Sequence, residues 1–191
     1  QVVFVLLSWP VLLGASVRAT AAAAKVSVGQ AQSTLRLLDE QELYDHRSRR
    51  LLRRDLLAER WAEAFAIGLG PKTQLKQFHG EPSRLILEGN GEVFVSGEQA
   101  ASWIRNPSTA TLYVDDFDPR LAFVNRWRTD EEPNISVRRT FWASPEDERP
   151  THFPAPAPPL LVYADLLATL EGRQLEAARK VKEDHAELWR S

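Results

Sequence analysis

Three aspartates that stand close together in the chain, Asp115, Asp116 and Asp118, are the residues best suited to metal chemistry. They follow a predicted strand over residues 109–114, and carboxylates at the end of a strand can hold Mg²⁺ in phosphoryl-transfer sites. The same residues also suit a turn, because Asp together with the following Pro119 commonly terminates a strand. The cluster therefore supports, as an alternative function, a metal-dependent phosphodiesterase or degenerate nuclease.

Other catalytic motifs are missing from the sequence. The glycines between residues 89 and 97 are not followed by the Lys-Ser or Lys-Thr of a phosphate loop. Glu88, Glu92 and Glu98 lack the lysine two positions later that a restriction-nuclease-like core needs. The chain has no cysteine, which excludes thiol catalysis and cysteine-ligated zinc, and its four histidines are scattered. We therefore expect a protein that is not an enzyme, with no catalytic residue, bound metal or cofactor.

One predicted helix carries a face of short polar side chains that suits the reading of DNA bases. Ser27 begins this helix and makes a capping box with Gln30 three positions later. Apolar residues recur at helical spacing and predict the buried side, namely Val28, Ala31, Leu35 and Leu38. The opposite side can hydrogen-bond to base edges. We expect DNA contacts from Ser27, Gly29, Gln30, Gln32, Ser33 and Arg36.

A short helix before this one and a basic hairpin after it complete the pattern of a winged helix-turn-helix. Ser16 can cap a helix over residues 17–24, and Lys25 and Val26 make the turn. Strands at residues 43–44 and 51–53 would flank a polar tip. The alternative to a wing is that this arginine-rich segment is a solvated hinge. In the winged interpretation the tip arginines meet phosphates or the minor groove, and they are Arg47, Arg49 and Arg50.

Charge is distributed unevenly along the chain of 191 residues, whose net charge is −2. Residues 1–60 contain nine Lys and Arg against six Asp and Glu, a net charge of +3, which leaves −5 for the remainder. A basic head on an acidic body is expected when only one part of a protein touches DNA. The composition, with 43% hydrophobic and 26% charged residues, indicates a globular chain with one domain or two small ones.

The apolar start of the chain, Val2 to Leu13, predicts a buried first helix. A signal peptide is the alternative, but no Lys or Arg precedes the run and Pro10 divides it. The run is shorter than the about 20 apolar residues that cross a membrane, so we expect no membrane partner and a cytoplasmic location. Because the chain begins with Gln1 and contains no methionine, we expect a fragment or a trimmed product.

The best boundary in the chain lies at residues 68–71, after a helix that Asp55 caps, and divides the chain into domains over 1–70 and 71–191. The predicted class is α+β: an N-terminal winged helix-turn-helix, then a mixed α/β domain with a largely antiparallel sheet and C-terminal helices. In the second part we expect paired strands at 84–88 and 92–96, a short helix at 97–104, paired strands at 120–128 and 134–141, polyproline II at 154–159, and helices at 160–170 and 175–188.

Several segments resemble the AbiEi-type antitoxins of type IV toxin–antitoxin systems. The most specific is Tyr163-Ala-Asp-Leu-Leu-Ala-Thr169, which is followed by residues 175–179. Residues 91–101, 110–114 and 138–142 resemble the middle of that family. The head, Ser16 to Gln30, resembles the winged helix-turn-helix in front of it. The sequence departs from the family after Thr169, where Leu-Glu-Gly replaces the usual turn resembling Gly-Asp-Pro.

This resemblance implies a DNA-binding antitoxin that represses its own operon and counteracts a nucleotidyltransferase-like toxin. Its partners would be operator DNA and that toxin, with direct or indirect action on the toxin. A third interpretation is an interaction module whose DNA binding is vestigial.

Tyr163, Asp165 and Thr169 could serve either the fold or a partner. Asp is a poor helix former unless its carboxylate has a partner. We expect Asp165 to pair with Arg126 or Arg138, and a direct toxin contact is the alternative.

Overall fold

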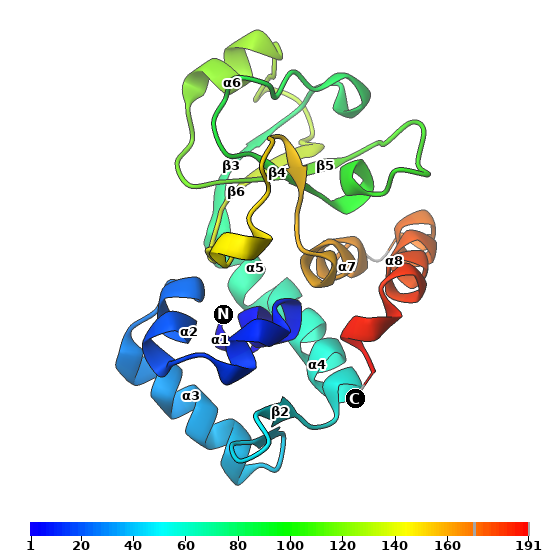
Figure 1. The fold of residues 1–191 in the computed structure, drawn as a ribbon. Coiled ribbons are helices and arrows are strands. Elements are labelled where there is room, and N and C mark those ends of the chain that lie inside the picture. Colours follow the sequence, from blue (N-terminus) through cyan, green and yellow to red (C-terminus); the bar gives the residue numbers. More distant parts are fainter. Residues whose placement is uncertain (170, 191) are drawn as a thin grey trace.

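The N-terminal part of the chain is helical. The structure is a computed structural model, and it describes residues 1–169 and 171–190. A two-stranded hairpin separates the third helix from the fourth (Figure 1). The elements are α1 (Val2–Ser8), a 3-10 turn (Pro10–Gly14), α2 (Val17–Ala23), α3 (Val28–Glu40), β1 (Tyr44–Asp45), β2 (Arg50–Leu51), α4 (Arg54–Ile67) and α5 (Leu69–Thr73).

A five-stranded sheet follows, with strand order β3-β6-β5-β4-β7. β3 pairs antiparallel with β6 and β4 with β5, whereas β5–β6 and β4–β7 are parallel. The chain therefore belongs to the expected α+β class, with helices before and after the sheet in sequence, but the sheet is evenly mixed rather than largely antiparallel. The elements are β3 (Gln74–Phe78), β4 (Phe94–Ser96), β5 (Ala110–Val114), α6 (Pro119–Val124), β6 (Ile135–Arg139), β7 (Ala155–Pro156), α7 (Pro159–Leu167) and α8 (Gly172–Asp184), with 3-10 turns at Pro82–Arg84, Gly97–Ala100, Glu146–Glu148 and Ala186–Leu188.

Each face of the sheet carries its own buried cluster, because side chains alternate along the strands. Leu112 of β5 and Val137 of β6 face a cluster covered by α6. Tyr113, next to Leu112 on β5, faces α7 and the N-terminal helices. Figure 1 shows α7 lying between the sheet and α4. None of the helices in the described ranges is both long and apolar enough to cross a membrane.

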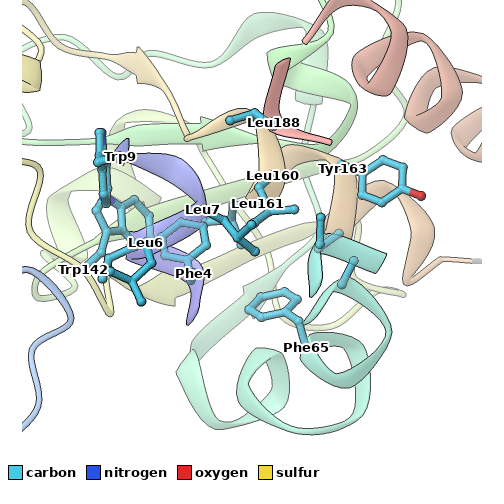
Figure 2. Close-up of a cluster of buried hydrophobic side chains, with 14 of the residues drawn as sticks. Phe4, Leu6, Leu7, Trp9, Phe65, Trp142, Leu160, Leu161, Tyr163 and Leu188 are labelled. Carbon is cyan, nitrogen blue, oxygen red and sulfur yellow. The ribbon is translucent and has the colours of Figure 1, made fainter. Parts of the chain in front are cut away.

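α1 is a buried core helix, as the apolar start of the chain predicts. Phe4 is fully buried, and its ring centroid lies 4.9 Å from that of Trp61 in α4 and 5.0 Å from that of Phe141 after β6. Figure 2 shows Phe4, Phe65 and Trp142 in this cluster with Leu160 and Leu161 of α7. One apolar core therefore extends from α1 to the sheet and α7.

The predicted pairing of strands at 84–88 and 92–96 is wrong, because residues 84–88 do not form a strand. The Asn125 side chain satisfies the backbone of Ile86 instead, accepting from its N–H at 2.7 Å and donating to its carbonyl at 2.9 Å. β4 finds its partners in β5 and β7.

The predicted strand over 120–128 is also wrong, since α6 occupies its first half. Asp118 caps this helix by accepting from the Arg120 N–H at 2.9 Å, and Pro119 takes the first position, where its missing N–H costs nothing. Phe123, which a half-buried strand over these residues would turn inward with Leu121 and Trp127, is 84% exposed. β6 consequently pairs with β3 and β5 rather than with this segment.

Further element predictions need smaller corrections. The proline-rich segment enters the sheet as the edge strand β7, with the Ala155 N–H donating to the Val93 carbonyl at 3.0 Å; proline is tolerated at an edge. The expected helix over 97–104 is a 3-10 turn that ends at Ala100. α4 has Arg53 rather than Asp55 at its N-cap. α7 ends at Leu167, and the expected last residue, Leu170, lies outside the described residues.

Candidate nucleic-acid interface

α2 and α3 are joined by a four-residue connection, residues 24–27, and both helices are capped by serine. The Oγ of Ser16 accepts from the Ala19 N–H, and the Oγ of Ser27 accepts from the Gln30 N–H, each at 3.1 Å. These bonds satisfy backbone donors that the first turn of a helix leaves open. Lys25 takes a left-handed conformation with φ of 49° and turns the chain between the helices. α2, this turn and α3 therefore occupy the segments that the sequence predicts for two helices and the turn between them.

The polar face of α3 is exposed and forms one wall of a groove of about 580 Å³. Four of the predicted DNA-contacting residues line it, together with Tyr44 and His46 of the hairpin. Gln30 is exposed beyond this groove, while the Ser27 hydroxyl is engaged in capping. Arg36 lies 3.5 Å from Glu40, one turn later. The groove residues from α3 are Gly29, Gln32, Ser33 and Arg36.

The buried side of α3 differs from the prediction at one position. Ala31 and Leu38 are buried and Leu35 is half-buried, but Val28 is 46% exposed. Val28 is the first residue of the helix, directly after the N-cap Ser27.

The hairpin tip holds its arginines at the surface. The Asp45 carboxylate accepts from the Arg47 N–H at 2.9 Å and from the Ser48 hydroxyl at 2.5 Å, and the second of these bonds most strongly lowers the pKa of Asp45. Arg47, Arg49 and Arg50 are all exposed. Arg49 also donates to the Gly14 carbonyl at 3.1 Å, which ties the tip to the segment before α2.

The Asp165 carboxylate is buried, with 2% of its side chain exposed, and has partners on three strands. The Arg138 guanidinium donates to it at 2.6 Å, the Ser96 hydroxyl at 2.6 Å and the Tyr113 hydroxyl at 3.0 Å. Arg138 is one of the two expected partners, and Arg126 is exposed elsewhere. Burial raises the pKa of Asp165, and Arg138 opposes this shift. The network joins α7 to β4, β5 and β6.

The chain matches the family model AbiEi_2, described as "Transcriptional regulator, AbiEi antitoxin, Type IV TA system", over residues 50–187. It belongs to the AbiEi_2 family. No curated protein and no solved structure matches the chain. The AbiEi_2 match begins at β2, so α2 and α3 lie before the matched segment.

Within the AbiEi_2 segment, Tyr163 and Thr169 have local partners. The Tyr163 hydroxyl donates to Glu59 of α4 at 2.7 Å, and burial, followed by this bond, raises the pKa of Tyr163 above its ordinary value. Glu59 also accepts from Lys182 at 2.6 Å and from the Trp189 indole at 2.9 Å. The Thr169 hydroxyl donates to the Leu166 carbonyl at 2.9 Å. Tyr163 thus links α7 to α4.

Sequence reasoning missed two glutamates that organise this AbiEi_2 chain. Glu59 joins α4, α7 and α8, yet on α4 it reads as an ordinary surface residue. Glu98 is 1% exposed and accepts from the backbone N–H of Ser108 at 2.6 Å and of Thr109 at 3.3 Å. Its partners are a loop ten and eleven residues later and Arg173 of α8 at 3.3 Å, and no local pattern in the sequence links them to Glu98.

The three aspartates of the alternative function do not share a site. Asp115 pairs with Lys25 at 2.6 Å, Asp116 lies 3.7 Å from Arg139, and Asp118 caps α6. Across residues 1–169 and 171–190, no group of three or more His, Cys, Asp or Glu is arranged to hold a metal ion. This geometry gives the phosphodiesterase hypothesis no support.

Proposed function

We propose that this AbiEi_2 protein binds operator DNA through α3 and the β1–β2 hairpin, represses its own operon, and acts in the cytoplasm without catalysing a reaction. It would counteract a nucleotidyltransferase-like toxin, as the family resemblance implies. The observation that carries the DNA-binding part is the exposed polar face of α3, which lines one groove together with Tyr44 and His46 of the hairpin.

The dimensions and chemistry of α3 support insertion into the major groove. Its 13 residues span about 20 Å at about 1.5 Å per residue, and a major groove about 12 Å wide admits a helix. Arginine pairs well with guanine and glutamine with adenine, so Arg36 and Gln32 are the residues we assign to base contacts. Gly29 leaves open space beside the helix, since a Cβ there would meet no atom within 4 Å.

The hairpin supports a phosphate-contacting role. Arg47 and Arg50 are exposed, and Arg49 keeps further N–H donors beside its bond to Gly14. Contacts of this kind set the position of a protein on DNA and make its affinity depend on salt. Ser27 would act by capping α3 rather than by reading bases.

A salt titration tests the DNA-binding part. Replacing Arg47, Arg49 and Arg50 by alanine should reduce the slope of log affinity against log salt by about one unit for each lost phosphate contact. The probe is a labelled fragment of the protein's own promoter region, followed by fluorescence anisotropy. The matched control replaces three exposed arginines of the sheet part, Arg84, Arg105 and Arg120, and should leave the slope unchanged. Equal slopes for both triple variants would exclude the hairpin from the interface.

Co-expression tests the antitoxin part. A nucleotidyltransferase-like protein encoded next to this gene should arrest growth when expressed alone, and the full chain should restore growth. The triple hairpin variant should restore growth as well if neutralisation does not need DNA binding. Failure of the wild-type chain to restore growth would refute the antitoxin role and leave the DNA-binding result standing.

A further inference from the structure

Lys25 is the residue at which the chain leaves α2 and turns toward α3. Its N–H donates to the Ala22 carbonyl at 3.1 Å, and the N–H of Val26 donates to the Ala21 carbonyl at 3.0 Å. These two bonds form a Schellman motif, whose left-handed position is usually a glycine because a side chain is unfavourable there. Lys25 takes this position with φ of 49°. Backbone strain of this kind persists where other contacts hold the residue in place.

The Lys25 side chain makes such contacts with the sheet. Its ammonium donates to Asp115 at 2.6 Å and to the Thr140 hydroxyl at 3.2 Å, and this hydroxyl donates to Asp115. Asp115 and Thr140 directly follow β5 and β6, which are parallel neighbours, so both lie at the same edge of the sheet. Thr140 is buried, and its N–H donates to the Val114 carbonyl at 2.9 Å. Lys25, Asp115 and Thr140 together form an anchor between the turn and the sheet.

The start of α3 and the hairpin are attached to the sheet part at two separate places. Beside the anchor, the Ala143 N–H after β6 donates to the Ala23 carbonyl at the end of α2 at 2.7 Å. The hairpin is attached through α4, which runs from it toward the sheet (Figure 1) and packs against α7. Glu59 of α4 accepts from Tyr163 of α7 at 2.7 Å. The sheet part therefore fixes where α3 begins relative to the hairpin.

This arrangement bears on DNA binding, because α3 and the hairpin have to meet the DNA together. A surface that is already held in its bound arrangement loses less conformational freedom on binding, and its affinity is higher. Without the anchor, the start of α3 would move more freely relative to the hairpin, and binding would have to restrict that movement.

We propose that Lys25, Asp115 and Thr140 are positioning residues for operator binding, which hold the start of α3 in register with the hairpin by tying the turn to the sheet. This inference rests on the proposed DNA binding, but none of the three residues needs to touch DNA. It gives the sheet part a role in DNA recognition, although all the proposed DNA contacts come before it in the chain.

Asp115→Asn tests the anchor by the sign of its effect. The change removes a negative charge, which by electrostatics alone would strengthen DNA binding or leave it unchanged. The anchor predicts the opposite, with affinity for the labelled promoter fragment about two- to fivefold weaker, as expected for the loss of a partly exposed ion pair. Asp116→Asn, at a neighbouring carboxylate that is 92% exposed, is the matched control and should not weaken binding. Equal or tighter binding by Asp115→Asn would overturn the proposal.

Lys25→Gly separates positioning from direct contact with DNA. Glycine relieves the left-handed strain but removes the ammonium, so operator binding should again weaken by about two- to fivefold. The double variant with Asp115→Asn should bind no more weakly than Lys25→Gly, because both changes remove one interaction. If the losses add, and Lys25→Gly lowers the slope of log affinity against log salt by about one unit, Lys25 contacts phosphate directly and the proposal is wrong.

Two further comparisons separate this role from stability and from the proposed function. Ile135→Val, at a side chain 1% exposed in the cluster under α6, lowers the melting temperature without touching the anchor and should leave DNA affinity unchanged. All titrations are made at a temperature where circular dichroism shows each variant folded. If the wild-type chain does not bind the fragment, DNA binding fails and the anchor with it. If the wild type binds and Asp115→Asn binds equally well, the anchor alone is refuted.

Discussion

At the scale of single residues, Asp165 shows how an unusual residue type signals a contact. A mid-helix aspartate predicts a partner, and Arg138 is that partner. Tyr113 and Ser96 were beyond prediction, because they reach Asp165 only through a strand order that the sequence did not indicate. Glu59 gave no comparable signal, since a glutamate on a helix usually faces water.

Replacing Asp165 by alanine should strongly destabilise the fold. Arg138 would keep a largely buried charge, with 18% of its side chain exposed, but lose the carboxylate that neutralises it. Breaking such a pair on one side costs about 3–5 kcal/mol. Urea unfolding followed by circular dichroism measures the loss, with Asp116→Ala as the control at a carboxylate that is 92% exposed. A variant as stable as wild type that no longer neutralises the toxin would show instead that Asp165 belongs to a partner surface.

The Asp115–Lys25 pair should make stability depend on acidic pH. Hydrogen bonds from Lys25 and Thr140 lower the pKa of Asp115 in the folded state below its ordinary value of 3.8. Its contribution is therefore complete above pH 3.8 and is lost as the pH falls through the lower, folded-state pKa. Asp115→Asn should reduce the free energy of unfolding at pH 7 and flatten its decline below pH 4. An acid profile identical to that of wild type would contradict this role; Asp116→Asn is the control.

At the scale of elements, strong local signals in the sequence predicted α3, α4, α7, β5 and β6. Alternation of apolar and polar residues, taken alone, led to a wrong strand prediction. Residues 120–128 alternate in hydrophobicity, yet Asp118 and Pro119 together start a helix there. Residues 84–88 are apolar enough for a strand, but the Asn125 side chain hydrogen-bonds to the backbone N–H and carbonyl of Ile86 in place of a neighbouring strand. The proline-rich segment became a strand because β4 offered a free edge. The last two differences depend on tertiary partners that no short stretch of sequence contains, whereas the helix start at Asp118 and Pro119 is a local signal.

Ser27 allows capping and DNA contact to be separated at the start of α3. Ser27→Ala removes the bond to the Gln30 N–H and should lower stability by about 1 kcal/mol. Ser27→Asp keeps a cap but adds a negative charge, so it should preserve the melting temperature and weaken DNA binding if this end of α3 approaches phosphate. Thermal melts and anisotropy on the same samples measure both effects. Unchanged DNA affinity in Ser27→Asp would place the start of α3 away from the DNA backbone.

At the scale of the whole molecule, the N-terminal helices and the sheet share one core. The sequence predicts a division at residue 70, where glycines and Pro71 suggest a linker, but composition cannot reveal that α1 packs against α4, α7 and the segment after β6. Phe4 contacts both Trp61 of α4 and Phe141 beyond β6. Lys25 adds an ion pair from the turn of the proposed DNA-binding part to the end of β5.

This shared core predicts that the whole chain unfolds in a single cooperative transition. Phe4→Ala should cost about 3–5 kcal/mol, because the ring is fully buried and packs against the rings of Trp61, Phe141 and Trp142. The loss should lower the midpoint reported by tryptophan fluorescence and that reported by circular dichroism equally, since coincident probes indicate two-state unfolding. Val11→Ala, at a side chain that is 62% exposed, is the control and should shift neither midpoint. If the two probes separate in Phe4→Ala, with the helical signal lost before the sheet, the parts on either side of residue 70 are independent folding units.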